Sequence, residues 1–185
     1  MRAGRVLASI AALGLVVPLA DAAPRRAAPA GAQRPGPDLF AGYSYTHAGE
    51  AGLNGWSLVG SYPLRGELSL VADLSGHYGS FAGTDLGQLA FMGGVRWRAR
   101  PGHRLSPFAE GLVGAARTST SVEVIGGSVE DADTDWGFGF GGGLDYRLGE
   151  RWSVRGLVHL RVLWGEGATD EDPRFSVGAV YRFGP

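Results

Sequence analysis

The chain of 185 residues contains no cysteine, no lysine and, after its first twenty residues, no long uninterrupted apolar run. The absence of cysteine excludes a disulfide framework, a thiolate metal centre and a cysteine-linked lipid anchor. All 17 basic residues are arginine, which is unusual for a soluble domain, although a coding bias toward Ala, Gly and Arg explains it equally well. The net charge of −1 argues against a nucleic-acid partner.

The N-terminal segment has the three parts of a cleaved export signal. Two arginines form a short basic start, residues 6–20 are uncharged and apolar, and Ala20-Asp21-Ala22 places small residues at the positions that signal peptidase recognises. The apolar run is shorter than the ~20 residues that a spanning helix needs, and Pro18 interrupts it, so an uncleaved anchor is the weaker interpretation. We predict a signal peptide at residues 1–22.

The rest of the chain divides by composition into a spacer and one domain. Residues 23–37 are rich in Pro, Ala and Arg and too poor in large apolar side chains to bury a core, so we predict a flexible linker. Residues 38–185 have the length of a single domain. The chain's 32 glycines are too many for an ordinary α/β domain, and they lack the three-residue period of collagen.

Within this domain, apolar side chains alternate with small or polar ones at a period of two, which is the pattern of β-strands with one apolar face. The clearest case has large apolar residues at the even positions from Trp136 to Leu148, apart from Gly142, and glycine at every odd position from Gly137 to Gly143. In the least regular segment we place Glu110 inward. The expected strands are 39–47, 56–64, 68–75, 86–98, 105–118, 136–148, 152–164 and 175–183.

Strands that turn apolar residues toward lipid and small or polar residues toward a lumen are typical of membrane barrels. We therefore predict an all-β fold, an eight-stranded antiparallel transmembrane β-barrel in up-and-down meander order, over residues 38–185. A secreted lipocalin-like barrel that binds a small apolar ligand is the alternative, but the glycine face would then be its solvent surface, which is a poor one.

The end of the chain and its tryptophans support the membrane interpretation. The last segment has the pattern polar, any, Gly, any, any, aromatic, any, aromatic, which is typical of the terminal strand of outer-membrane barrels and serves as their assembly signal. Tryptophans near the ends of the apolar faces are expected to form an aromatic girdle at the membrane interfaces. The pattern residues are Ser176, Gly178, Tyr181 and Phe183, and the girdle residues are Trp136, Trp152 and Trp164.

The links between the expected strands alternate between short and long. Short turns in membrane barrels face the periplasm and long loops face outside, so both termini are expected on the periplasmic side. The longest expected loop, 119–135, is the best candidate to bind an extracellular partner, which the sequence does not identify. The short links are 65–66, 100–104 and 149–150, and the long ones are 48–54, 79–85, 119–135 and 165–173.

Together, the leader, the alternating segments and the ending SVGAVYRF resemble the small outer-membrane β-barrel family that includes OmpA-like transmembrane domains and OmpX-like proteins. The one departure is that Gly184 and Pro185 follow the terminal aromatic residue. The resemblance implies a monomer in the bacterial cell outer membrane that contacts lipid and lipopolysaccharide. It also implies the barrel-insertion machinery as a partner during assembly.

Side chains fill the interior of an eight-stranded barrel, so inward-facing charges must pair. If the sixth and seventh segments meet around 149–151 with their apolar faces outward, Asp145 lies opposite Arg155. We interpret the wider lumenal charge network as a structural plug, and a narrow pore lined by arginines that selects anions is the alternative. The expected members are Asp73, Arg96, Glu110, Asp145, Arg147, Arg155, His159, Arg161 and Arg182.

No catalytic, cofactor or metal site is predicted, and the function we expect is structural or surface interaction, such as envelope integrity, adhesion or loop-mediated binding. A lipid-modifying barrel enzyme is the weaker alternative: His47 and His77 are expected near the outer rim, with Ser44, Ser75 and Ser80 nearby but without the spacing of a nucleophile and its base. The acidic stretches 129–135 and 169–172 lack the spacing of an EF-hand. We expect them to be solvated loop tips that repel lipopolysaccharide or bridge it through divalent ions.

Overall fold

The computed structural model describes residues 36–48, 51–81, 84–101, 103–124, 127–164 and 169–184. The predicted signal peptide, and all of the predicted linker except its last two residues, lie outside the described residues. None of the described residues forms a helix long and apolar enough to span a membrane.

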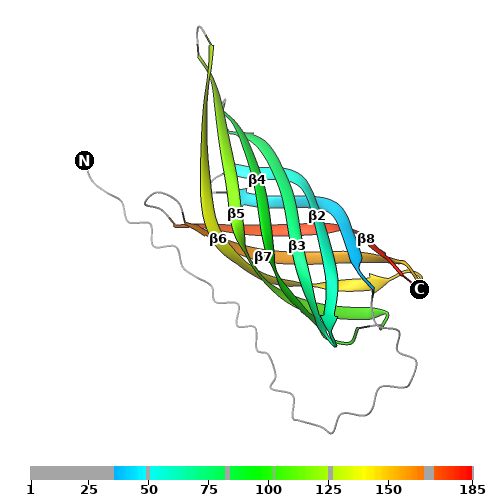
Figure 1. The fold of residues 1–185 in the computed structure, drawn as a ribbon. Coiled ribbons are helices and arrows are strands. Elements are labelled where there is room, and N and C mark those ends of the chain that lie inside the picture. Colours follow the sequence, from blue (N-terminus) through cyan, green and yellow to red (C-terminus); the bar gives the residue numbers. More distant parts are fainter. Residues whose placement is uncertain are drawn as a thin grey trace, which may run out of the picture. The chain divides into compact units, whose positions relative to one another are not determined.

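Eight antiparallel strands close into one barrel in which each strand pairs with its neighbours in the chain and the last pairs with the first (Figure 1). The predicted fold class, strand number and meander order are confirmed. The strands are β1 (Asp38–Ala48), β2 (Ala51–Arg65), β3 (Leu68–Phe81), β4 (Thr84–Arg98), β5 (Leu105–Val124), β6 (Gly127–Arg147), β7 (Trp152–Trp164) and β8 (Thr169–Arg182).

The two ends of the barrel differ in construction. At the end that we call the terminal end, Asp38 of β1 pairs with Arg182 of β8, and residues 66–67, 99–104 and 148–151 connect the strands. At the opposite end, the hairpin end, the chain turns between β1 and β2, β3 and β4, β5 and β6, and β7 and β8. The β5–β6 hairpin reaches beyond the other three (Figure 1).

The prediction of long loops at the hairpin end is wrong. Strand pairing continues through most of each expected loop, so that the segment 119–135 belongs to β5 and β6 and is paired from Ser119 with Ala132 to Val124 with Gly127. The expected loops at 48–54, 79–85 and 165–173 shorten in the same way. Serine, threonine and valine suit a strand, and each added residue satisfies its backbone groups on the partner strand.

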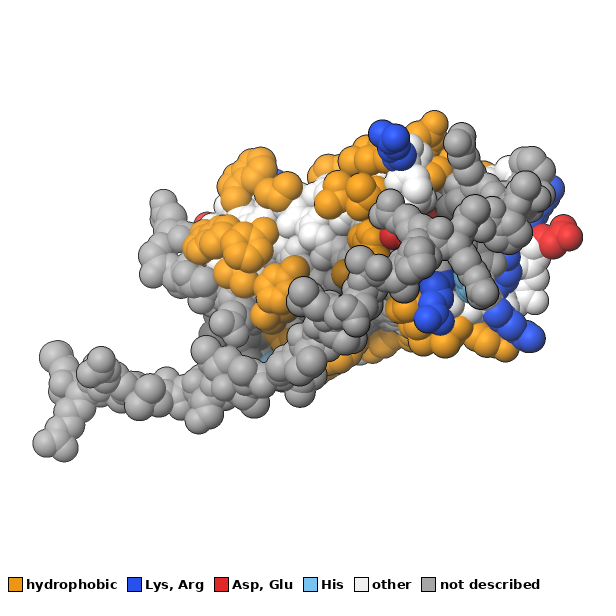
Figure 2. Space-filling view, turned by 90° about the horizontal axis from the view of Figure 1, so that it is seen from below, with side chains coloured by type: hydrophobic (Ala, Val, Ile, Leu, Met, Phe, Trp, Pro, Cys, Tyr) orange, Lys and Arg blue, Asp and Glu red, His pale blue; other side chains and the backbone are white. Residues whose placement is uncertain are grey.

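Large apolar side chains cover the outside of the barrel wall (Figure 2). Trp136, Trp152 and Trp164 all point outward, with exposed fractions of 67, 53 and 47%. Trp136 pairs with Trp164 toward the hairpin end, whereas Trp152 pairs with Tyr181 at the terminal end, where the two rings meet edge to face at 5.1 Å. Because the apolar faces point outward, the secreted lipocalin-like alternative is wrong.

The glycine face of β6 makes room inside the barrel. Its glycines lie opposite the large lumenal side chains of β7, with Gly139 facing Arg161 and Gly141 facing His159. A Cβ atom at Gly139 would lie 3.5 Å from Arg161 and 3.6 Å from Met92, and one at Gly141 would collide with the His159 ring and a backbone oxygen. The missing side chains therefore provide the volume that the charged residues of β7 occupy.

Candidate functional site

The lumen holds a network of buried charged side chains. Among the described residues, four arginines, Arg96, Arg155, Arg161 and Arg174, are less than 2% exposed. Burying a guanidinium is costly unless a carboxylate and further hydrogen bonds compensate for the lost water. The buried carboxylates are Asp38, Asp73, Glu110, Asp145 and Asp172.

At the terminal end, Arg155 and Asp145 lie directly opposite each other on β7 and β6 and form a two-pronged ion pair. Arg155 Nε donates to Asp145 Oδ1 at 2.6 Å, and its Nη2 donates to Oδ2 at 3.0 Å. Asp38 accepts from Arg98 at 3.1 Å and from Arg155 at 3.3 Å, and Arg98 also lies 3.3 Å from Asp145. Two carboxylates are thus shared by two guanidinium groups from different strands.

The middle of the lumen links this cluster to the hairpin end. Arg96 donates to Glu110 at 2.5 Å, and His159 Nε2 lies 2.5 Å from the second oxygen of Glu110. Arg174 lies 2.7 Å from His159 Nδ1. Arginine has no acceptor atom, so His159 Nδ1 accepts this bond and Nε2 carries the proton that it donates to Glu110. His159 therefore links Glu110 on one side of its ring to Arg174 on the other.

At the hairpin end each arginine has a carboxylate of its own. Arg174 forms a two-pronged pair with Asp73, and Arg161 Nη2 donates to Asp172 at 2.5 Å and to Gln88 at 2.8 Å. Asp172 accepts a further hydrogen bond from a threonine of β1. The prediction that 169–172 is a solvated loop tip is wrong at Asp172, which is 2% exposed, because β8 begins at Thr169 and turns this side chain inward.

Apolar and aromatic side chains pack around the charges. A cluster that includes Phe40, Phe108 and Leu157 fills the lumen between the strands. The Arg96 and Arg155 guanidinium groups lie over the Phe108 ring at 4.6 and 5.1 Å from its centroid. Such cation–π contacts stabilise the parts of each guanidinium that no carboxylate reaches. Charged, aromatic and aliphatic side chains therefore share the described interior of the barrel.

Seven of the nine predicted network residues are brought together in this way, and two are not. Within the described part of the chain, Arg147 and Arg182 form no ion pair, although Arg182 is only 8% exposed. Sequence analysis missed further members, which the period of two could have placed on the inward faces once the true strand ends were known. They are Asp38, Arg98, Asp172 and Arg174.

The terminal-strand pattern residues lie where the last strand closes the barrel. Ser176 of β8 faces Ser44 of β1, and their hydroxyl oxygens are 2.8 Å apart inside the wall. Gly178 lies opposite Gly42, where a Cβ atom on either residue would collide with the other strand. Tyr181 and Phe183 stack edge to face at 5.0 Å at the terminal end.

The structure brings one serine and one histidine together that the sequence did not pair. His77 lies inside the barrel instead of on an exposed rim, and its Nε2 is 2.9 Å from Ser44 Oγ. Both residues are fully buried, and His77 Nδ1 has no partner among the described residues that could orient the ring. The geometry of a nucleophile and its base is present, but neither access for a substrate nor a third group to hold the base accompanies it.

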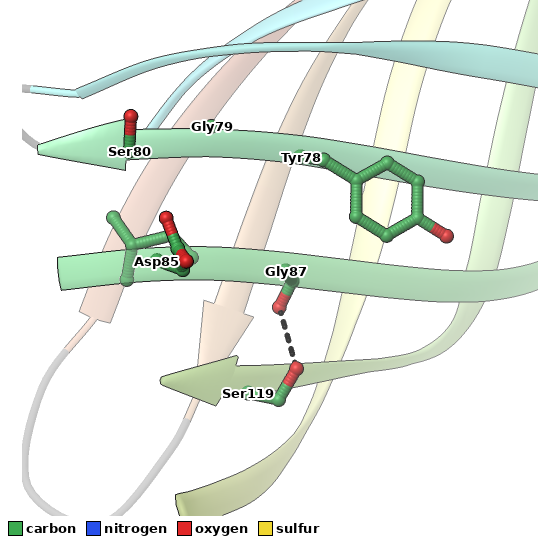
Figure 3. A pocket seen from close by; sticks show the side chains of 7 residues that line it. Tyr78, Gly79, Ser80, Asp85, Gly87 and Ser119 are labelled. Atoms are coloured by element: carbon green, nitrogen blue, oxygen red, sulfur yellow. Dashed lines mark hydrogen bonds between the residues drawn. The ribbon is translucent and has the colours of Figure 1, made fainter. Parts of the chain in front are cut away.

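On the outside, the described residues form a shallow groove at the hairpin end (Figure 3). Tyr78, Gly87 and Ser119 lie in one row across β3, β4 and β5, and Ser80 and Asp85 form the next row. Ser119 Oγ donates to the backbone oxygen of Gly87 at 3.4 Å. Asp85 is the one charged residue that lines this groove, and no cluster of metal-binding side chains occurs in the described parts of the chain.

Comparison with known proteins is consistent with this geometry. Residues 9–183 match the family described as outer membrane protein beta-barrel domain. No curated protein matches the chain in sequence.

Three solved structures illustrate the likeness in fold. Ail, the attachment invasion locus protein of Yersinia pestis, has a TM-score of 0.63 at 17% identity, over 81% of this chain and 100% of its own. Neisserial surface protein A has a TM-score of 0.62 at 15% identity, over 80 and 96% of the two chains. The N-terminal β-barrel domain of Pseudomonas aeruginosa OprF has a TM-score of 0.53 at 17% identity, over 80 and 100%. At such identities the likeness concerns the fold alone.

Proposed function

This chain belongs to the outer-membrane β-barrel family, and on that premise we propose that it has a structural and surface-interaction role in the bacterial outer membrane, without conduction or catalysis. The proposal rests on one observation: paired charges and apolar side chains occupy the lumen from Asp38 at one end to Asp172 near the other. A lumen crossed by paired charges suits a structural plug, and the outer surface and hairpins are then the places where extracellular molecules can bind.

The proposed orientation follows from the family's usual topology, with the terminal end in the periplasm and the hairpin end outside. The β5–β6 hairpin is then the main extracellular feature, because its strands of 20 and 21 residues exceed the others, the longest of which have 15. Lipid and lipopolysaccharide would surround the apolar wall of a monomer. The terminal strand would provide the signal that the barrel-insertion machinery recognises.

The charge of this hairpin suggests the kind of partner. A structure of Yersinia pestis Ail is a complex with the heparin analogue sucrose octasulfate, a polyanion. Here the hairpin carries Glu123, Glu130, Asp131 and Asp133 and is acidic. A polyanion would be repelled, so we propose a cationic partner surface, or anionic lipopolysaccharide bridged through divalent ions.

Catalysis is disfavoured by burial. The Ser44–His77 pair is enclosed by the wall, and an acyl-transfer enzyme needs its nucleophile at a position that a lipid or peptide can reach. We propose that this pair is a structural hydrogen bond that helps to close β1 against β3.

Two measurements test the proposed function. Planar-bilayer recordings of the purified protein should show no stepwise conductance, and adhesion of cells that display it should fall when Glu130, Asp131 and Asp133 are changed to Gln, Asn and Asn. The matched control is Asp85→Asn on the neighbouring β3–β4 hairpin, which should leave adhesion unchanged. Regular single-channel steps from the unmodified protein would favour the anion-selective pore instead.

A further inference from the structure

Three neighbouring side chains at the terminal end have buried donor atoms without an acceptor. Arg147 Nε, Ser153 Oγ, and Arg182 Nε and Nη1 are all buried and make no hydrogen bond within the described part of the chain. Arg147 lies opposite Ser153 across β6 and β7, and Ser153 lies opposite Val180, two residues from Arg182 on β8. The period of two places all three on the lumenal side of adjacent strands.

The charges of this region do not balance. Five arginines face the lumen on the terminal side, whereas the carboxylates there are Asp38, Glu110 and Asp145. All three carboxylates are already bonded to Arg96, Arg98 or Arg155. Within the described residues, two guanidinium groups therefore remain without a bonded carboxylate, those of Arg147 and Arg182.

These two charges lie close enough to act on each other. Arg147 and Arg98 both lie within Coulombic range of Arg182, and so do Asp145 and Asp38, whose oxygens are engaged elsewhere. Water could accept the free hydrogen bonds, but it would leave two neighbouring like charges uncompensated at a partly buried site. An oxyanion does both, because its several oxygens accept from guanidinium and hydroxyl donors while its charge offsets theirs.

We propose that Arg147, Ser153 and Arg182 form a binding site for a phosphate-class oxyanion at the terminal end of the lumen. The group is either a free phosphate ion or the headgroup of an anionic phospholipid, since both present the same oxygens. Hydroxyl and guanidinium donors from three adjacent strands would hold the anion, and in doing so it would also clamp the closing strand β8 to β7 and β6. The site lies apart from the outer hairpins on which the proposed function rests.

The first test uses the protein extracted from membranes into a zwitterionic detergent, with the melting temperature read from loss of the compact gel band. Sodium phosphate should raise the melting temperature above the value in sodium chloride of equal ionic strength, because a ligand of the folded state stabilises it. In Arg147→Gln and Arg182→Gln the apparent phosphate affinity should fall about tenfold or more, the usual effect of losing a charge-assisted bond. Arg65→Gln, an exposed arginine at the same end, should behave like the unmodified protein.

If Arg182→Gln fails to fold, Arg147→Gln and Ser153→Ala carry the test. An equal rise in both salts, or a phosphate effect that persists in the variants, would overturn the site. Reconstitution then distinguishes the source of the anion. A variant-sensitive gain in stability in phosphatidylglycerol vesicles over phosphatidylcholine vesicles identifies a headgroup, and a gain in phosphatidylcholine only after phosphate is added identifies the free ion. Absence of both gains would also overturn the site.

Discussion

At the hairpin end of the lumen Arg161 and Arg174 each reach a carboxylate of their own, whereas from the middle to the terminal end five arginines face three carboxylates. The first arrangement is balanced in charge, although Arg161 Nε and Nη1 and Arg174 Nε make no hydrogen bond within the described residues. The second holds its carboxylates between several cations, and within the described part of the chain it leaves Arg147 and Arg182 without a carboxylate. The same residue type is therefore matched by carboxylates at one end of the lumen and outnumbers them toward the other.

The two arrangements show how a small barrel tolerates charge in its interior. A buried arginine is stable where its carboxylate lies on a facing strand, as Asp145 does for Arg155, or across the lumen, as Asp73 does for Arg174. Removal of a shared carboxylate should therefore cost more than removal of a private one.

The largest effect is expected from Asp145→Ala. This change removes the carboxylate that Arg155 and Arg98 share, and it leaves two buried cations that must be compensated by Asp38 alone. The free energy of unfolding should fall by about 3–5 kcal/mol, the usual cost of breaking a buried pair. Urea titration of the folded and unfolded gel bands measures it. Asp133→Ala, an exposed residue on the same strand, is the control, and equal losses in the two variants would refute the network.

A smaller effect is expected where the two ends are joined. A methyl group at Gly141 would collide with the His159 ring, which links Glu110 to Arg174, so Gly141→Ala should lower the free energy of unfolding by about 1–3 kcal/mol. Gly156→Ala is a matched control, because Gly156 faces outward with open space around its Cα. The same urea titration compares them. A Gly141→Ala variant as stable as the control would mean that the glycine face has no role in packing.

The hairpin end should respond less than the terminal end to loss of a single charge. Asp172→Asn keeps the shape of the side chain and its hydrogen bond from Thr46, and it affects only Arg161, which retains Gln88. We expect a loss of about 1–2 kcal/mol, near the value of one charged hydrogen bond. The comparison with Asp145→Asn is decisive, because a larger loss at Asp172 would reverse the order of the two ends.

Much of the wall could be predicted from the sequence because it obeys one local rule. The period of two fixes which face of each strand meets lipid, and a short turn then fixes the register of the next strand, so Asp145 and Arg155 could be placed opposite each other before the structure was known. Pairs that cross the lumen, such as Arg174 with Asp73 or Arg98 with Asp38, join strands that are not hydrogen-bonded neighbours or lie far apart in sequence. Their meeting depends on barrel closure, which no local pattern encodes.

The length of the strands at the hairpin end could not be predicted for a related reason. Beyond the apolar band a strand needs no apolar face. The segment 119–135 therefore lacks the alternation of apolar and polar side chains, although its backbone pairing continues. The same loss of alternation explains why the sequence predicts a loop at Asp172, which is buried in β8. Hydrophobic periodicity reports the contact with lipid, and it ends where the lipid ends although the strand continues.

The smallest effect is expected from shortening the β5–β6 hairpin. Beyond Val122, which pairs with both Thr84 and Val129, the described residues of β5 pair only with β6, so the tip adds no strand pairing to the rest of the described wall. Replacement of Glu123–Ser128 by Asn-Gly, a sequence suited to a two-residue hairpin turn, should change the free energy of unfolding by no more than about 0.5 kcal/mol. The compact band on unboiled gels should persist. Loss of that band would show that the tip is needed to form the barrel, and would place part of its stability outside the membrane-spanning wall.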